Sequence, residues 1–187
     1  MVPFVLRWPR LGRRGQRLDT LINAPDVMPT LLGLMGAPVP QRVEGTDLSF
    51  VLTGAPGEEP TAAFIGNPCP FHGDAEGLPE WRGVRTKRYT YVRGLDGPMY
   101  LFDNAVDPYQ LNNLAGDPAA SGLLARLDAE LQSWLVRLDD DFAPAQEYIE
   151  RFEYEVDERG IVPYCDEVGL SDLEGSRTDG TRRVPLR

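Results

Sequence analysis

Only a few side chains in the sequence could act as nucleophiles or soft metal ligands. The 187 residues include two cysteines, Cys69 and Cys165, and one histidine, His72. One histidine and two distant cysteines cannot supply the four ligands of a zinc site, and their spacing does not show whether the cysteines pair. Nothing around Cys69 supports a nucleophile, so we expect a free or packed thiol.

Charged residues are more numerous, but they do not form a recognisable ligand pattern. The run Asp139-Asp140-Asp141 lacks the glycine and the spaced oxygen ligands of a calcium loop. We therefore predict a solvated end of a helix there, and a solvated hairpin tip at Arg85, Lys87 and Arg88. The sequence assigns no catalytic residue and no metal ligand.

Charge and hydropathy exclude two classes of partner. The formal net charge is −10, and a protein that binds nucleic acid needs an excess of Lys and Arg for phosphate contacts. No apolar run approaches the roughly 18 residues of a membrane-spanning helix, and the first residues do not have the pattern of a signal peptide. We predict neither a nucleic-acid nor a membrane partner.

The middle of the chain predicts a small antiparallel sheet covered by one long helix. Aromatic and β-branched residues alternate over 81–93 around a polar break at 86–88, and a third arm covers 99–103. A further strand is predicted over 61–65. After an Asp117-Pro118 helix start, apolar residues recur every three or four positions, as in an amphipathic helix: Leu123, Leu124, Leu127, Leu131, Trp134, Leu135 and Leu138.

Apolar segments also lie on both sides of this unit. The run 2–8 is typical of a strand buried in a parallel sheet. A helix is predicted from Asn23 to Gly36, apolar enough to need covering neighbours, with Pro29 tolerated only in its first turn. A weaker amphipathic helix is predicted over 148–156, packed on its own core.

These patterns divide the chain into four parts. Residues 1–40 carry the first strand and helix, and the Pro- and Gly-rich residues 41–60 connect them to the sheet. Residues 61–160 form the antiparallel-sheet subdomain with its helices. The polar residues 161–187 are predicted to be a disordered tail.

Five segments, taken in order, resemble the C-terminal part of a sulfatase. Residues 2–9 resemble the last core strand of that family, and residues 26–36 resemble its D-x-x-P-T-L-L-x-L-x-G helix. Residues 45–48 resemble G-x-S/D-L, and residues 82–91 resemble strands of the family's C-terminal sheet. Residues 101–114 resemble L-Y-D-L-x-x-D-P-x-E-x-x-N-L. The resemblance implies the alkaline-phosphatase-like α/β fold, seen here as an α+β portion with about four antiparallel strands.

The resemblance also implies which parts of a sulfatase the sequence lacks. The family makes formylglycine from the cysteine of a C-x-P/A-x-R motif and binds calcium through upstream acidic residues. Cys69 begins Cys-Pro-Phe-His-Gly and Cys165 begins Cys-Asp-Glu-Val-Gly, so neither fits. We therefore expect a C-terminal fragment, inactive alone, whose partner is the missing N-terminal core. Calcium and formylglycine would belong to that core.

The implied activity is hydrolysis of a sulfate ester, on a sulfated small molecule or glycan. In a whole enzyme, His72, Trp81 and Arg82 are candidates for substrate contacts, because arginine suits anionic ligands. The alternative for each is structural: a solvated loop histidine, a tryptophan packed on the sheet, and an exposed arginine. Two other functions stay open, namely a non-catalytic binding module and a fragment of a phosphohydrolase with the same fold.

Overall fold

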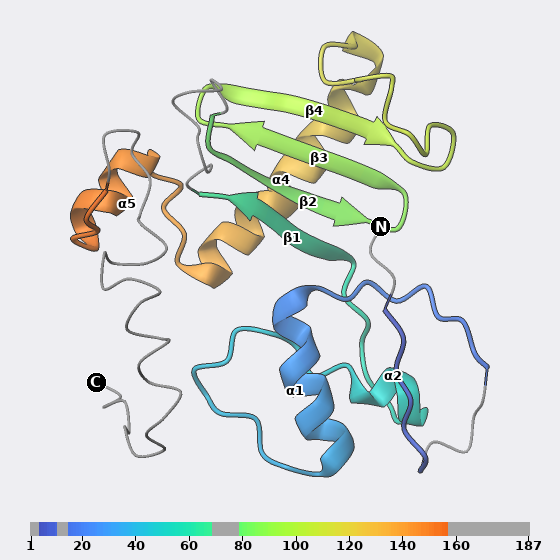
Figure 1. Ribbon diagram of the computed structural model, residues 1–187. Coiled ribbons are helices and arrows are strands. Elements are labelled where there is room, and N and C mark those ends of the chain that lie inside the picture. The colour runs from blue at the N-terminus through green and yellow to red at the C-terminus, as the bar shows by residue number, and fades with distance from the viewer. Residues whose placement is uncertain (1–3, 11–14, 69–78, 157–187) are drawn as a thin grey trace, which may run out of the picture. The chain divides into compact units, whose positions relative to one another are not determined.

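The computed structural model describes residues 4–10, 15–68 and 79–156 (Figure 1). The chain separates into two compact units. Of the described residues, 4–10, 15–68 and 79–143 belong to the first unit, and 144–156 belong to the second. No helix in the described ranges is long and apolar enough to cross a membrane. The predicted subdivision at residues 41–60 stays a prediction, and the predicted tail at 161–187 lies outside the described residues.

The first unit contains the predicted antiparallel sheet. Its four strands pair in sequence order, each antiparallel to the next. The polar residues 87–88 form the turn between β2 and β3, at the predicted polar break, and Leu95-Asp96 form the turn between β3 and β4. The α/β fold class and the four-stranded sheet are confirmed. The strands are β1 (Ala62–Asn67), β2 (Trp81–Thr86), β3 (Tyr89–Gly94) and β4 (Gly97–Asp103).

The predicted long helix, α4 (Ser121–Leu138), covers one face of this sheet (Figure 1). It follows a short 3₁₀ helix, η1 (Pro118–Ala120), whose start is capped by Asp117: the Asp117 carboxylate accepts a hydrogen bond from the Ala119 amide at 2.9 Å. Side chains one turn apart along α4 pack against alternate residues of the strands. The buried core they form contains Ala62, Val84, Tyr91, Leu101, Leu127, Leu131 and Leu135.

Helix α1 (Ala24–Met35) has the predicted N-terminus. The Asn23 side chain accepts a hydrogen bond from the Ala24 amide at 2.9 Å, and Asp26 accepts one from the Asn23 amide at 2.7 Å, a capping box. Gly36 ends the helix at a φ of 70°. The short helix α2 (Ser49–Thr53) follows in the connecting segment.

Pro29 does not lie in the first turn of α1, so the prediction that the helix tolerates this proline only in its first turn was wrong. It is the sixth residue of the helix and cannot donate a hydrogen bond to the carbonyl of Pro25. That carbonyl instead lies against Gly45, where any Cβ would collide with it. Because glycine lets the backbone approach this closely, the connecting segment can pack against the helix at the point where proline interrupts it.

The strand predicted over residues 2–8 is also wrong for its described part. Residues 4–8 are not in a strand, and Val5 is 91% exposed. A strand forms only when neighbouring strands satisfy its backbone N–H and C=O groups. None of the described strands pairs with this run, so its hydrophobic composition alone does not make it a strand.

The second unit contains helix α5 (Ala145–Arg151). The helix predicted over 148–156 ends at Arg151, earlier than expected. Tyr148 and Phe152 stack with their ring centroids 6.3 Å apart. At Glu153 the chain turns with a φ of 54°, and the Tyr154 amide donates back to the Ile149 carbonyl at 3.0 Å. This left-handed turn is incompatible with further helix.

The burial of α4 predicts a sharp difference between two of its positions. Leu131 is 0% exposed and Val136 is 82% exposed. Leu131→Asp places a carboxylate among apolar side chains, so we expect a loss of several kcal/mol of unfolding free energy, enough to abolish a cooperative transition. Val136→Asp should melt like the parent. Circular dichroism during heating measures both, and equal melts would contradict the packing.

Amide exchange should differ between the N-terminal run and the sheet. Strand β3 pairs on both sides, with β2 and β4, whereas residues 4–8 are in no strand. We expect slow exchange at 89–92 and fast exchange at 4–8, because exchange follows local opening. Mass-spectrometric exchange on the 187-residue chain measures both, and comparable protection would refute the assignment.

Candidate functional site

Two of the predicted site residues begin strand β2, but they lie on opposite faces of the sheet. Successive side chains of a strand alternate between faces. Val84 packs against α4, so Arg82 shares the face of α4 and Trp81 lies on the other face. The structure therefore does not bring these two side chains onto one surface. His72, Cys69 and Cys165 lie outside the described residues, and their roles stay predictions.

Arg82 is buried, so its expected exposed position was wrong. Its side chain is 2% exposed and contacts Asp140 through two nitrogen–oxygen pairs, Nε–Oδ2 at 2.5 Å and Nη2–Oδ1 at 3.2 Å. The guanidinium also lies over the Phe142 ring, 4.9 Å from its centroid. Since guanidinium and carboxylate are both planar, two contacts fix their relative orientation.

The prediction that Asp139-Asp140-Asp141 form a solvated end of the long helix is therefore wrong for the middle residue, Asp140. Asp139 ends α4 at a φ of 51° and is exposed. Asp140 turns inward to Arg82, and its Oδ1 also accepts a hydrogen bond from the Phe142 amide at 2.9 Å. A carboxylate at a helix C-terminus opposes the helix dipole, but here the arginine compensates for it.

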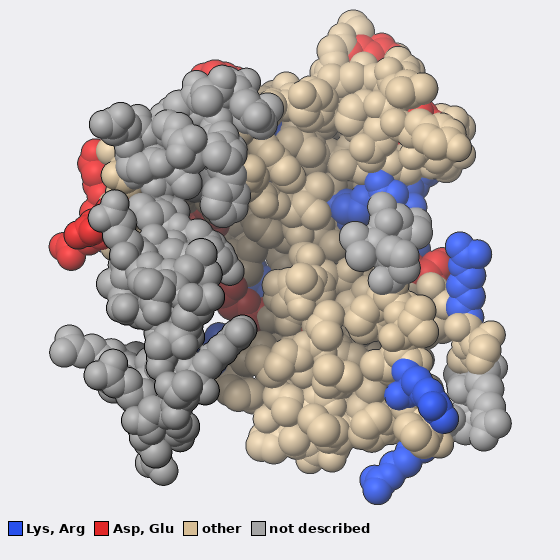
Figure 2. Space-filling view, viewed as in Figure 1, with Lys and Arg blue, Asp and Glu red and all other residues tan. Residues whose placement is uncertain are grey.

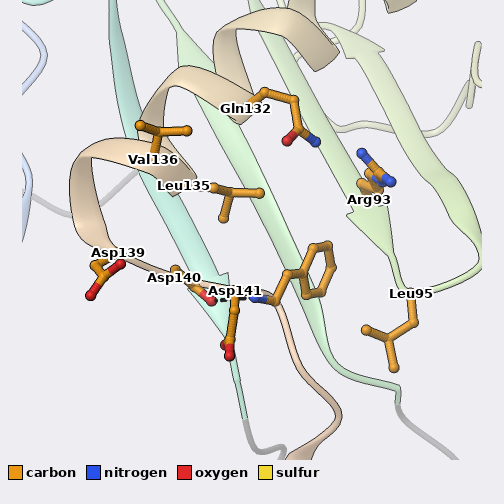
Figure 3. A pocket seen from close by; sticks show the side chains of 9 residues that line it. Arg93, Leu95, Gln132, Leu135, Val136, Asp139, Asp140 and Asp141 are labelled. Carbon is orange, nitrogen blue, oxygen red and sulfur yellow. Dashed lines mark hydrogen bonds between the residues drawn. The ribbon is translucent and has the colours of Figure 1, made fainter.

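An open hollow of about 520 Å³ lies beside this ion pair. Figure 3 shows the acidic residues at the end of α4 on one side and Arg93 on the other. Most of the lining is polar, with apolar groups from the helix and the β3–β4 turn. The lining residues are Arg93, Leu95, Gln132, Leu135, Val136, Asp139, Asp140, Asp141 and Phe142.

Asp128 forms an ion pair with Arg93, which lines one edge of this hollow. Its Oδ1 accepts a hydrogen bond from the Tyr91 hydroxyl at 2.7 Å and lies 3.3 Å from Nη1 of Arg93. Burial, and then the hydrogen bond to Asp128, raise the pKa of Tyr91, so this phenol is a proton donor and not a base at neutral pH.

The two arginines at or beside the hollow do not offer a free positive charge to a sulfate group. Arg93 contacts Asp128, and Arg82 lies against Asp140. Each of these arginines is thus already paired with a carboxylate, so neither is a free cation for a sulfate group. None of the lining residues is a cysteine, histidine, serine or threonine.

The segment after β4, which resembles a sulfatase motif, has a structural role. Asp103 receives hydrogen bonds from Arg88 that lower its pKa, the shortest at 2.6 Å. Asp107 accepts from the Asn112 amide at 2.8 Å, and this with neighbouring amides lowers its pKa. Asn113 accepts from the Leu101 amide at 2.9 Å. These acceptors satisfy backbone N–H groups and hold the turn in place.

The described residues do not fit the metal and cofactor that the family resemblance implies. Within residues 4–10, 15–68 and 79–156, no three His, Cys, Asp or Glu side chains lie close enough to hold a metal ion. Neither cysteine in the sequence begins the C-x-P/A-x-R motif. No step of sulfate-ester chemistry can therefore be assigned to these residues.

Two acidic residues of this region could not be identified from the sequence. Asp140 is 58 positions from Arg82, and Asp128 is 35 positions from Arg93. Each pair forms only when α4 lies across the strands. An acidic residue among several others on a helix carries no signal of its partner, so only the tertiary structure identifies these pairs.

The fold defines a small α+β domain, a four-stranded antiparallel sheet with one long helix packed on it. A model of N-sulphoglucosamine sulphohydrolase, C-terminal, matches residues 1–137. The chain belongs to this family, and the resemblance to sulfatases is confirmed. Two of its relatives are an ulvan-active sulfatase of Formosa agariphila, 40% identical over 154 residues, and an endo-4-O-sulfatase of Bacteroides thetaiotaomicron, 32% identical over 169 residues.

The matches cover most of this chain but only a minor part of each relative. Each alignment covers 82% of this chain but only 30% and 33% of the two relatives. The solved structure of a 2-O GAG sulfatase superposes with a TM-score of 0.58 at 30% identity, covering 68% of this chain and 28% of that one. The chain therefore spans about a third of the length of the curated relatives it matches.

The buried ion pair predicts an asymmetry between two neighbouring aspartates. Asp140→Asn removes the charge opposite the buried Arg82, and we expect a loss of about 2 kcal/mol or more of unfolding free energy. Asp139→Asn should cost little, because Asp139 is exposed and asparagine tolerates its left-handed backbone. Denaturant titration measures both variants. A similar small effect of the two would show that the pair contributes little.

Proposed function

We propose that this chain acts as the C-terminal domain of a sulfatase that hydrolyses sulfate esters of a glycan. The observation that carries the proposal is the family match over residues 1–137, together with 40% identity to a sulfatase of which the chain spans 30%. The antiparallel sheet, α4 and the turn after β4 supply a rigid body. The catalytic groups belong to the portion of the enzyme that this chain does not match.

The names of the relatives favour a sulfated glycan over a sulfated small molecule. Three relatives at least 30% identical over most of this chain are an ulvan-active sulfatase, an endo-4-O-sulfatase and a Δ4,5-hexuronate-2-O-sulfatase. All three names specify sulfatases, and this favours sulfate esters over phosphate esters. The phosphohydrolase alternative has weaker support, since a multifunctional alkaline phosphatase superfamily protein is 27% identical over 144 residues.

In this proposal the partner of the chain is the catalytic core of the enzyme. Calcium and formylglycine would be held by that core, because the described residues fit neither. The role of this chain is to support the core. Residues Trp81 and His72 remain candidates for substrate contacts, whereas the burial of Arg82 against Asp140 supports a structural role for it.

A chimeric enzyme tests this function. The region of the Formosa agariphila sulfatase that aligns with this chain is replaced by this chain, and sulfate release from ulvan is measured. We expect the chimera to release sulfate, because the 40% identical domain should support the same core. The isolated 187-residue chain should release none, since neither cysteine begins the formylglycine motif.

The control is the same relative truncated at the junction without a replacement. A chimera that folds cooperatively but releases no sulfate would contradict the proposed function. Sulfate release by the isolated chain, abolished by Cys69→Ala, would contradict the assignment of catalysis to the core.

A further inference from the structure

Trp81 begins strand β2 and lies on the face of the sheet away from α4, which Figure 1 shows toward the viewer. Directly opposite residues of antiparallel strands share a face, and Trp81 lies between Asn67 of β1 and Gly94 of β3. The next residue of β2 on this face is Gly83. Two of the three nearest positions on this face therefore carry no side chain. Neither glycine can be replaced without movement, because neighbouring atoms fill the space that a Cβ would need.

The Trp81 indole has no partner among the residues that the structure describes. The ring is partly exposed and stacks on no other aromatic ring in this part of the chain, unlike Trp134, which packs against Phe64 with ring centroids 6.3 Å apart. Its N–H group, which can only donate a hydrogen bond, has no acceptor there. A partly exposed aromatic ring with a free donor is typical of a binding surface.

The Asn67 side chain lies beside this ring and is also unpaired within residues 4–10, 15–68 and 79–156. Directly opposite Cβ atoms are about 5 Å apart, so the Asn67 amide is within reach of a molecule that stacks on Trp81. The amide offers both donors and an acceptor. An aromatic ring next to an uncharged amide suits a sugar, whose C–H groups contact the ring while its hydroxyls form hydrogen bonds.

The charges around this end of β2 disfavour a sulfate group as the ligand. Arg82 and Arg93 lie on the face of α4, and each has a carboxylate partner. Figure 2, drawn from the side of the sheet opposite α4, shows Lys and Arg side chains near the β2–β3 turn, at the other end of β2. A site without a free cation suits the sugar ring of a sulfated glycan better than its sulfate group.

The buried Arg82–Asp140 pair holds the backbone at this position. Arg82 follows Trp81 in β2, and its Nη1 donates a hydrogen bond to the Trp81 carbonyl at 3.2 Å. From the end of α4, Asp140 fixes the two other nitrogens of the same guanidinium. The Asp140 carboxylate therefore acts on Trp81 through Arg82, although the Trp81 side chain lies on the opposite face of the sheet.

We propose that Trp81 and Asn67 form a subsite for one sugar ring of the sulfated glycan, and that the Arg82–Asp140 pair positions Trp81 there. This inference rests on the proposed function. The sugar ring stacks on the indole, and its hydroxyl groups bind the Asn67 amide and the indole N–H. No bond is made or broken at this subsite. It adds affinity for the glycan beyond that of the sulfate group itself.

The first test is a nitrogen-15 NMR titration of the 187-residue chain with desulfated oligosaccharides prepared from ulvan. The indole N–H signal of Trp81 and the side-chain amide signals of Asn67 should shift progressively with ligand concentration. The indole signal of Trp134, on α4 and packed against Phe64, should not shift. Inorganic sulfate alone should leave all of these signals in place, because the subsite has no free cation.

The second test measures sulfate release from ulvan by the chimera with the Formosa agariphila core. Trp81→Ala should raise KM about fivefold, in line with the loss of one stacked ring, and should change kcat less. Tyr109→Ala is the matched control, because Tyr109 is 83% exposed on the turn after β4, and it should leave KM unchanged.

Asp140→Asn tests the positioning role in the same chimera. By itself it should raise KM about threefold. It should add nothing when Trp81 is already alanine, because Asp140 acts through that side chain. Asp140→Glu, which keeps the charge opposite Arg82 but lengthens the side chain, gives the same comparison if Asp140→Asn does not fold.

Three results would overturn the inference. The first is a titration in which the signals of Trp81 and Asn67 shift no more than that of Trp134. The second is a chimera in which Trp81→Ala lowers the melting midpoint but leaves KM unchanged, since Trp81 would then be a packing residue. The third is additivity of Trp81→Ala and Asp140→Asn in their effects on KM, since Asp140 would then act independently of Trp81.

These outcomes are separable from failure of the proposed function. If the parent chimera folds but releases no sulfate, the function fails, while the NMR titration still tests the subsite. If the parent chimera is active and Trp81→Ala has the same KM as Tyr109→Ala, the function stands and the subsite is wrong.

Discussion

The packing of three leucines of α4 against one face of the sheet determines most other features of this domain. Leu127, Leu131 and Leu135 are buried against Val84, Tyr91 and Leu101. Because strand residues alternate, this one contact decides which side chains point to the helix and which point away. It places Arg82 and Arg93 within reach of aspartates, and it places Arg85 on the side without them. The core and the ion pairs therefore depend on the same packing.

The charged groups of the domain accordingly serve the fold more than they serve chemistry. Asp140 compensates a buried guanidinium, and Asp128 binds both a buried phenol and Arg93. The aspartates and asparagines after β4 satisfy backbone amides. A motif shared with sulfatases is therefore explained here by the geometry of a turn, and its presence does not locate the active site.

Apolar side chains are exposed in two other parts of the described chain. Helix α1 exposes Met28 and Met35, seven residues apart on one side of the helix. The apolar run at residues 4–8 is in no strand. Segments with the composition of a protein interior that are exposed in this chain are consistent with a role as one part of a larger enzyme.

The sequence by itself was sufficient for the local elements and for the family. Alternation of aromatic and β-branched residues predicted β2 to β4, and the leucine period predicted α4 and its buried face. The order of five motifs predicted a sulfatase C-terminal domain, which the family match confirmed. These signals are local, because strand and helix periods and turn residues are properties of short segments.

The tertiary structure decided the features that depend on partners distant in the chain. Residues 4–8 have the composition of a strand but no strand beside them, and the sequence does not show that. Arg82 and Asp140 are 58 positions apart, so their burial together appears only when α4 crosses the sheet. Arg82 and Arg85 lie on the same strand, but their side chains point to opposite faces of the sheet. The sequence shows that an arginine is positively charged. Whether that arginine forms an ion pair with a carboxylate depends on which elements pack around it.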